Sequence, residues 1–203
     1  MRHPVISREN PLVLASSSPR RKRLLRQVGL PFRSRPGRVP EGFDPAEDAP
    51  FAACSLAEKK ARSRSGKTGG RWTLGADTMV VLGGRILGKP GCEEEAREML
   101  RLLSGREHEV ITGFCILDPW LRRAHLEAIS TRVRMRRLSE EDIRAYTATG
   151  EPFGKAGSYA IQGIGAFLVE AISGSYTNVV GLPVCALIQS LLAVGALHTF
   201  PIR

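Results

Sequence analysis

Apolar and polar positions alternate along the chain with two periods, one typical of strands and one typical of helices. Residues 11–15 form a short apolar run that predicts a strand. A serine cap and Pro19 follow, and apolar residues then recur at helical spacing from Leu24 until Gly29 ends the segment. The pattern predicts a strand, a turn and a helix at the start of the chain.

The rest of the chain repeats this alternation. Residues 31–50 are rich in Pro and Gly and are expected to form extended chain and loops. Helices are expected at 51–65, 93–104, 139–149 and 184–197, and strands at 72–82, 85–88, 109–117 and 124–137, with glycines mixed among strand-like residues at 154–172. This order predicts an α/β fold with a mixed twisted sheet flanked by helices. We expect a single domain over residues 11–203, with two lobes and a central cleft, after an N-terminal extension of residues 1–10.

Composition narrows the class of protein. The 203 residues are 42% hydrophobic and 25% charged, which is ordinary for a globular protein and excludes a disordered or collagen-like chain. No apolar run approaches the roughly 20 residues of a membrane span, and the first ten residues do not resemble a signal peptide. The four cysteines form no C-x-x-C pair, so we expect a reduced protein of the cytoplasm without a zinc cage.

Charge points to a polyanionic partner. The chain has 30 Lys and Arg against 20 Asp and Glu, a net charge of +10, and most of the cations are arginines, whose planar forks suit phosphate. Nucleic acid, an anionic membrane surface and small phosphate compounds are all compatible with this charge.

The predicted first helix start is a candidate phosphate site. Ser16 and Ser18 supply hydroxyl donors, Arg20 and Arg21 supply guanidinium groups, and the helix start adds unpaired N–H groups with a partial positive charge. A capped helix with a solvated basic first turn would show the same residues. The segment alone therefore leaves both interpretations open.

Asp77 is the candidate general base. It stands in a polar triplet that is expected to interrupt the apolar strand at 72–82, and a carboxylate buried there needs a cation, a metal or water. Lys89 lies between Gly and Pro after a predicted hairpin, and Lys155 opens a glycine-rich run that contains Gln162. Cations, serines and one base suit phosphate-ester chemistry with a divalent metal.

An ordered set of short motifs resembles the Maf (septum-formation-protein-like) family, from about Leu12 to Pro183. The motifs are Leu14-Ala-Ser-Ser-Ser-Pro-Arg-Arg21, Gly75-Ala-Asp-Thr78, Leu87-Gly-Lys-Pro90, Leu103-Ser-Gly-Arg106 with His108 and Thr112, Gly150-Glu-Pro152, Lys155-Ala-Gly157, Ile161-Gln-Gly163 and Asn178-Val-Val-Gly-Leu-Pro183. The resemblance implies a Maf/ITPase-like fold. It also implies a nucleoside triphosphate pyrophosphatase, which releases a nucleoside monophosphate and pyrophosphate.

Roles for single residues follow from this resemblance. It implies that Asp77 is the general base and that Asp77 and Glu41 hold Mg²⁺ or Mn²⁺. The implied substrate-binding residues are Ser16, Ser18, Arg20, Arg21, Lys60, Lys89 and Lys155, and the implied specificity residues are Arg20, Thr78 and Gln162. The Ile-Gln-Gly branch of the family resembles dTTP/UTP pyrophosphatases, and a carboxamide at 162 can both donate to and accept from uracil or thymine.

Other interpretations remain open. A branch with Glu in place of Gln162 prefers 7-methyl-GTP, so a pyrophosphatase of that type is one alternative. This chain also departs from the family pattern at residues 38–41, where only Glu41 is acidic, and at Gly154 and Ala160. These departures permit a nucleotide-binding regulatory or cell-division factor with little turnover.

A nucleic-acid-binding protein using the arginines at 20–26 and 132–137 is a further alternative. Only 6% of the residues are aromatic and no nucleic-acid module signature is present, which argues against it. The expected partners are thus a nucleoside triphosphate and, since the family often dimerises, a second copy of the chain, with no nucleic acid and no membrane.

Overall fold

The computed structural model describes residues 4–37, 39–40, 42, 47–63 and 68–202. Its regular elements, in chain order, are β1 (Leu12–Leu14), α1 (Pro19–Gln27), β2 (Phe32–Ser34), α2 (Ala49–Arg62), β3 (Thr73–Leu82), β4 (Arg85–Leu87), α3 (Glu93–Leu103), β5 (Glu107–Leu117), β6 (Arg123–Met135), α4 (Glu140–Ala148), the 3₁₀ helices η1 (Ala156–Ser158) and η2 (Ile164–Leu168), β7 (Val169–Ser173), α5 (Tyr176–Val180) and α6 (Val184–Ala193). None of the described helices is long and apolar enough to cross a membrane.

The strands form one mixed sheet in the order β2-β1-β3-β5-β6-β7, with β4 paired to β3. β1 runs parallel to both β2 and β3, whereas β4 pairs antiparallel with β3 and β7 antiparallel with β6. The mixed sheet flanked by helices confirms the predicted α/β class.

The chain divides into two compact units. Unit 1 comprises Met1–Asp77, Thr112–Ile129 and Gly181–Arg203, and unit 2 comprises Thr78–Ile111 and Ser130–Val180. Strands β3, β5 and β6 contribute residues to both units, so each unit is built from segments far apart in the sequence.

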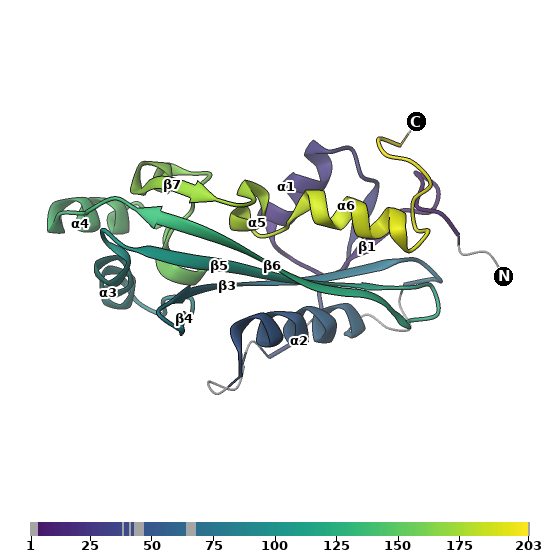
Figure 1. Ribbon diagram of the computed structural model, residues 1–203, viewed down its shortest axis with the longest axis horizontal. Helices are drawn as coiled ribbons and strands as arrows, with labels where there is room; N and C mark the ends of the chain where they lie inside the picture. Colours follow the sequence, from purple (N-terminus) through teal and green to yellow (C-terminus); the bar gives the residue numbers. More distant parts are fainter. Residues whose placement is uncertain (1–3, 38, 41, 43–46, 64–67, 203) are drawn as a thin grey trace. The chain divides into compact units, whose positions relative to one another are not determined.

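In unit 1, α2 covers one face of the strands and α1 and α6 cover the other (Figure 1). The N-terminal residues belong to this unit, because the backbone N–H of Ile6 donates to Ala196 O and the Trp72 indole donates to Pro4 O. The Ile6 side chain is buried. The described part of the predicted extension is therefore packed against the domain.

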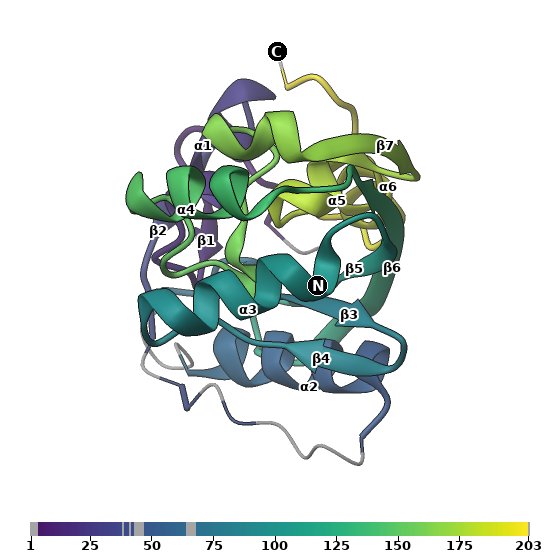
Figure 2. The same ribbon diagram turned by 90° about the vertical axis from the view of Figure 1, so that its left-hand side faces the viewer.

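In unit 2, α3 and α4 lie side by side (Figure 2), and the Arg101 guanidinium of α3 bonds both carboxylate oxygens of Glu140 on α4. α4 begins with a capping box in which Ser139 and Asp142 satisfy each other's backbone N–H groups. The buried apolar side chains of this unit include Val80, Leu100 and Tyr146.

Several predicted elements differ from those observed. Strand β2 lies in the segment that was expected to form extended chain and loops, and its parallel hydrogen bonds to β1, which have no local signal, make it part of the sheet. β3 continues through the polar triplet at 76–78 without interruption. Helix α5 was not expected, and α6 ends at Ala193 rather than at 197, just before Gly195 with its φ of 73°.

Candidate active site

The serine loop between β1 and α1 is ordered by its own hydroxyl groups. Ser18 is the N-cap of α1, and its Oγ accepts a hydrogen bond from the backbone N–H of Arg21 at 3.4 Å. Ser16 Oγ accepts from the N–H of Ser18 at 3.2 Å, and the Ser16 side chain is buried. The predicted capped helix start is confirmed.

Arg21 ties this loop to a distant part of unit 1. Its side chain is only 8% exposed, its Nε donates to the carbonyl of Gly181 at 2.8 Å, and its Nη1 donates to Ser16 Oγ at 3.3 Å. The guanidinium thus holds Ser16 in place. Its direct contact with phosphate stays a prediction.

Arg20 has a different environment. Its side chain is half-buried, and within the described part of the chain no hydrogen bond or ion pair to its guanidinium is observed. Burial lowers the pKa of Arg20, because removal from water disfavours the charged form. A partly desolvated cation at a helix start gains from an anionic ligand, but the role of Arg20 in phosphate binding stays a prediction.

Asp77 forms an ion pair with Lys60. Lys60 Nζ lies 2.5 Å from Asp77 Oδ1, and each side chain is 15% exposed. Asp77 belongs to β3 and Lys60 to the last turn of α2, so the two predicted site residues meet although they lie 17 positions apart. The pairing satisfies the requirement of a buried carboxylate for a cation.

Two glycines bring α2 this close to the sheet. A Cβ atom on Gly75 would lie 2.1 Å from Ala57 O, and a Cβ on Gly113 would lie 2.4 Å from the carbonyl carbon of Ala53. Gly75 and Asp77 are two residues apart on a strand and therefore face the same side. The backbone of α2 packs directly against Gly75. This close packing brings the Lys60 side chain next to Asp77.

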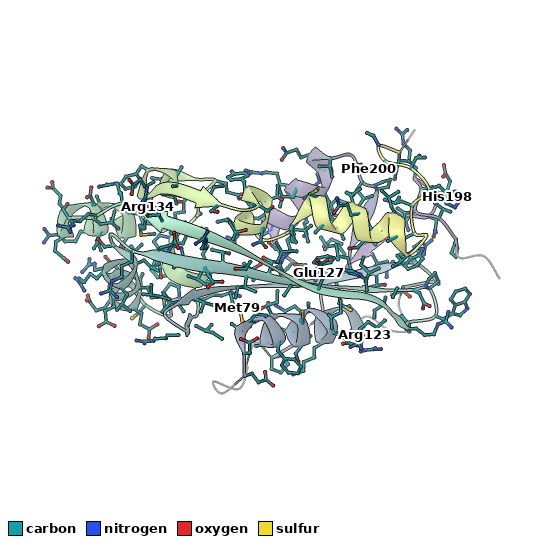
Figure 3. All side chains as sticks on the ribbon, in the orientation of Figure 1. Met79, Arg123, Glu127, Arg134, His198 and Phe200 are labelled. Carbon is teal, nitrogen blue, oxygen red and sulfur yellow. The ribbon has the colours of Figure 1, made fainter. Side chains whose placement is uncertain are left out.

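A surface ion pair supports the outer side of α2. Arg123 of β6 lies beside α2 (Figure 3), and its Nη1 is 3.1 Å from Glu58 Oε2. Arg62 bonds the other oxygen of the same carboxylate at 2.7 Å. Both arginines are about half-exposed, so we expect this pair to orient α2 with little gain in stability.

The serine loop and Asp77 both lie just beyond the same end of the parallel β1–β3 ladder, although β3 itself continues past Asp77. Ala15 N–H donates to Leu74 O at 2.8 Å, so the loop begins one residue beyond the end of the β1–β3 ladder and Asp77 stands three residues beyond Leu74. In α/β proteins ligands bind outside the carboxyl ends of parallel strands, where helix N-termini also point. Unit 1 therefore gathers hydroxyl groups, a helix start, cations and one carboxylate on this edge.

The other predicted residues belong to unit 2, apart from Glu41, which lies outside the described residues. Thr78 is half-buried in β3, and Lys89 is exposed after β4. The Lys155 ammonium donates to the carbonyl of Glu151, and Gln162 is half-buried between η1 and η2. Their roles in substrate binding stay predictions.

The described residues contain no group of three or more His, Cys, Asp or Glu side chains that could hold a metal ion. Asp77 is a single carboxylate with part of its surface open. Mg²⁺ is commonly held by only one or two carboxylates together with substrate phosphates, and Asp77 fits such an open site. The described residues do not fit a site in which protein side chains supply all the metal ligands.

A family model described as "Maf-like protein" matches residues 11–194. The chain belongs to the Maf family. A protein of Syntrophotalea carbinolica named dTTP/UTP pyrophosphatase is 49% identical over 191 residues, which cover 93% of this chain and 87% of that protein. Proteins of the same name from Geobacter sp. strain M21 and Geobacter sulfurreducens are 49% and 48% identical and cover 92% of this chain and 96% and 97% of their own length.

One solved structure also resembles this Maf chain. It is described as a nucleoside-triphosphatase / dITP/XTP pyrophosphatase from Mycobacterium abscessus, is 17% identical with a TM-score of 0.40, and covers 63% of this chain and 75% of that one. A similarity at this level carries no argument about activity.

The structure adds contributors to this Maf site that residue chemistry did not reveal. Gly75 and Gly113 seat α2, and the Gly181 carbonyl holds Arg21. The isolated glycine within the apolar run at 72–82 was a usable signal, because such a glycine often marks a close backbone approach. Nothing near Gly181 in the sequence could reveal a partner 160 residues away.

Proposed function

We propose that this Maf protein is a nucleoside triphosphate pyrophosphatase that hydrolyses dTTP and UTP to the nucleoside monophosphate and pyrophosphate. Relatives named dTTP/UTP pyrophosphatase that match 92% or 93% of the chain at 48% or 49% identity carry this proposal. The Lys60–Asp77 pair supports it, because it supplies a positioned carboxylate on the edge of unit 1 that also carries the serine loop.

In this proposal Asp77 accepts a proton from the attacking water. The water oxygen bonds the α-phosphorus, the bond from that phosphorus to the bridging oxygen breaks, and pyrophosphate leaves with the electron pair. Lys60 holds the carboxylate in place, and Arg20, Lys89 and Lys155 offset charge on the phosphates. Bound at Asp77, with Glu41 as a second proposed ligand, Mg²⁺ or Mn²⁺ would neutralise phosphate charge and polarise the reacting group.

Gln162 is proposed to select the base. Its carboxamide can donate to O4 and accept from N3–H of uracil or thymine, whereas a carboxylate can only accept. Arg20 and Thr78 are proposed as further specificity residues. Gln162→Glu should therefore lose the pyrimidine preference, and an unchanged ranking of substrates would remove Gln162 from this role.

The test is a nucleotide panel with product identification. Purified protein with Mg²⁺ or Mn²⁺ should convert dTTP and UTP to monophosphate and pyrophosphate, and chelation of the metal should stop turnover. Asp77→Asn should lose most activity while its circular dichroism spectrum stays unchanged. Release of orthophosphate and a nucleoside diphosphate would contradict the proposed bond cleavage, and nucleotide binding without turnover would favour a regulatory factor.

The proposed setting is the cytoplasm, and all four cysteines are free thiols, as a reducing compartment requires. A homodimer is proposed as the assembled form. Sedimentation velocity of the purified protein tests it, and a monomer at micromolar concentration would contradict it.

A further inference from the structure

The segment that carries Gln162 is held at both ends by one pair of side chains in unit 2. Tyr146 of α4 accepts a hydrogen bond at its Oη from the backbone N–H of Ala160 at 3.1 Å. The same hydroxyl donates to Glu151 Oε2 at 2.8 Å. On the other side of Gln162, the backbone N–H groups are bonded by Glu151 itself.

Glu151 binds the far side of the segment through two amides. Its Oε1 accepts from the N–H of Ile164 at 3.0 Å, and its Oε2 accepts from the N–H of Gly165 at 2.8 Å. Tyr146 and Glu151 together, named here the Tyr–Glu clamp, thus bond backbone positions 160, 164 and 165. Gln162 lies between these anchored positions, on a turn closed by the Gly163 N–H and the Ala160 carbonyl at 3.3 Å.

Glycines let the clamp reach the backbone. A Cβ on Gly163 would lie 1.9 Å from Glu151 Oε1, and a Cβ on Gly165 would lie 2.5 Å from Tyr146 Oη. Any side chain at either position would displace the clamp. The two glycines that follow Gln162 are therefore matched to these two polar side chains.

The ionisation states of Glu151 and Tyr146 decide which of them donates and which accepts in these hydrogen bonds. Burial opposes ionisation of Glu151, but hydrogen bonds from the Gly165 N–H and the Tyr146 hydroxyl outweigh it, so its pKa lies below the ordinary value. Burial, together with the hydrogen bond to Glu151, raises the pKa of Tyr146. At neutral pH the tyrosine is therefore the donor and the carboxylate accepts all three bonds.

A second contact fixes the approach to this segment. Tyr159, 7% exposed, bonds His108 Nε2 through its hydroxyl at 2.8 Å, and the two rings meet edge to face. His108 belongs to β5, and its own side chain is 3% exposed. The residue directly before the clamped segment is thus anchored to the sheet of the same unit.

We propose that Tyr146 and Glu151 are positioning residues that fix the Gln162 backbone so that its carboxamide distinguishes uracil and thymine from cytosine. The proposal rests on the proposed function and assigns the clamp a part in base selection. Cytosine presents an amino donor where uracil presents the O4 acceptor. Binding cytosine therefore requires the Gln162 carboxamide to turn over and exchange its oxygen and NH₂ positions. A backbone held on both sides of Gln162 limits the room for that second arrangement, whereas a loosened backbone allows both.

The experiment compares kcat/KM for UTP and CTP in three variants. Glu151→Gln keeps the size of the side chain but turns an NH₂ group toward one of the donors it now bonds, and Tyr146→Phe removes only the hydroxyl. Each should reduce the UTP/CTP ratio of kcat/KM by about tenfold, the worth of roughly one hydrogen bond. Amide hydrogen exchange at Ile164 and Gly165 should become faster in Glu151→Gln.

Ser139→Ala is the matched control. It removes the cap of the same helix, α4, and should lower the melting temperature by about 2–4 °C without contacting the clamped segment. Its UTP/CTP ratio should stay that of the wild type. A ratio that falls equally in Ser139→Ala would reduce the clamp to a general support of the fold.

The outcomes separate this inference from the proposed function. If the wild type hydrolyses UTP and both clamp variants keep its UTP/CTP ratio, the positioning role is wrong while the proposed function stands. If the wild type hydrolyses no nucleoside triphosphate, the proposed function and the inference fail together. Tyr146→Phe keeps the test decisive even if Glu151→Gln does not fold, because it retains the carboxylate and the aromatic ring.

Discussion

Lys60 Nζ of helix α2 lies 2.5 Å from Asp77 Oδ1 of strand β3, and each of the two side chains is only 15% exposed to solvent. This pair joins the predicted general base to a predicted phosphate-binding cation. Breaking such a pair leaves an uncompensated charge in a poorly solvated place. We therefore expect Lys60 to act on the reaction through Asp77.

A double-mutant cycle tests this coupling. Asp77→Asn should reduce kcat for UTP by about 10²–10⁴-fold, as expected for loss of a general base. Lys60→Met should cost less, and the double variant should be no slower than Asp77→Asn, because both act through one group. Pyrophosphate release measures the rates. Losses that multiply in the double variant would mean that the two residues act independently.

Arg20 should contribute mainly to substrate binding. Arg20→Ala removes a partly desolvated cation and should raise KM for UTP by about 10–100-fold, the range of a charge-assisted hydrogen bond. Arg23→Ala is the control, because Arg23 is exposed on the same helix. Steady-state kinetics provide the measurement. Equal effects of the two substitutions would point to general helix charge and not to a phosphate contact.

Gly75 should be intolerant of a side chain. In Gly75→Ala the new Cβ would meet Ala57 O at 2.1 Å, so α2 must move away from β3 and separate Lys60 from Asp77. We expect the free energy of unfolding to fall by about 1–3 kcal/mol and activity to fall with it. Urea denaturation measures the stability change.

Gly88→Ala is the matched control for that stability measurement. A Cβ on Gly88 would meet nothing within 4 Å, and its φ lies outside the left-handed region. Its free energy of unfolding should change by less than about 0.5 kcal/mol. A loss as large as that of Gly75→Ala would mean that the packing of α2 does not explain the sensitivity.

His108 should make stability depend on pH. Burial lowers the pKa of His108 to about 4 from its ordinary 6.5, so the unfolded chain binds a proton that the folded chain does not between these values. Stability should therefore fall as pH decreases from about 6.5 to about 4, by about 3 kcal/mol from this group.

Denaturation of the wild type and His108→Gln across this range isolates the contribution, because the carboxylates titrate in both proteins. The variant should show the flatter curve. Parallel curves would show that His108 is protonated in the folded protein or does not titrate in this window.

The sequence by itself determined the elements whose signals are local. The Ser18 cap with Pro19 and the Ser139 capping box fix helix starts through hydrogen bonds that span three residues. The mixed α/β class followed from the alternation of short apolar runs with amphipathic ones. Asp77 stood out because a carboxylate among apolar residues demands a partner, whichever partner the fold supplies.

Only the tertiary structure decided which groups meet. Strand β2 exists because β1 offers it parallel hydrogen bonds, Arg21 bonds a carbonyl 160 residues away, and Lys60 reaches Asp77 because Gly75 admits the α2 backbone. The Tyr–Glu clamp likewise depends on Gly163 and Gly165 having no side chains. Local patterns act over about four residues, whereas these contacts depend on close packing between segments that the sequence keeps apart.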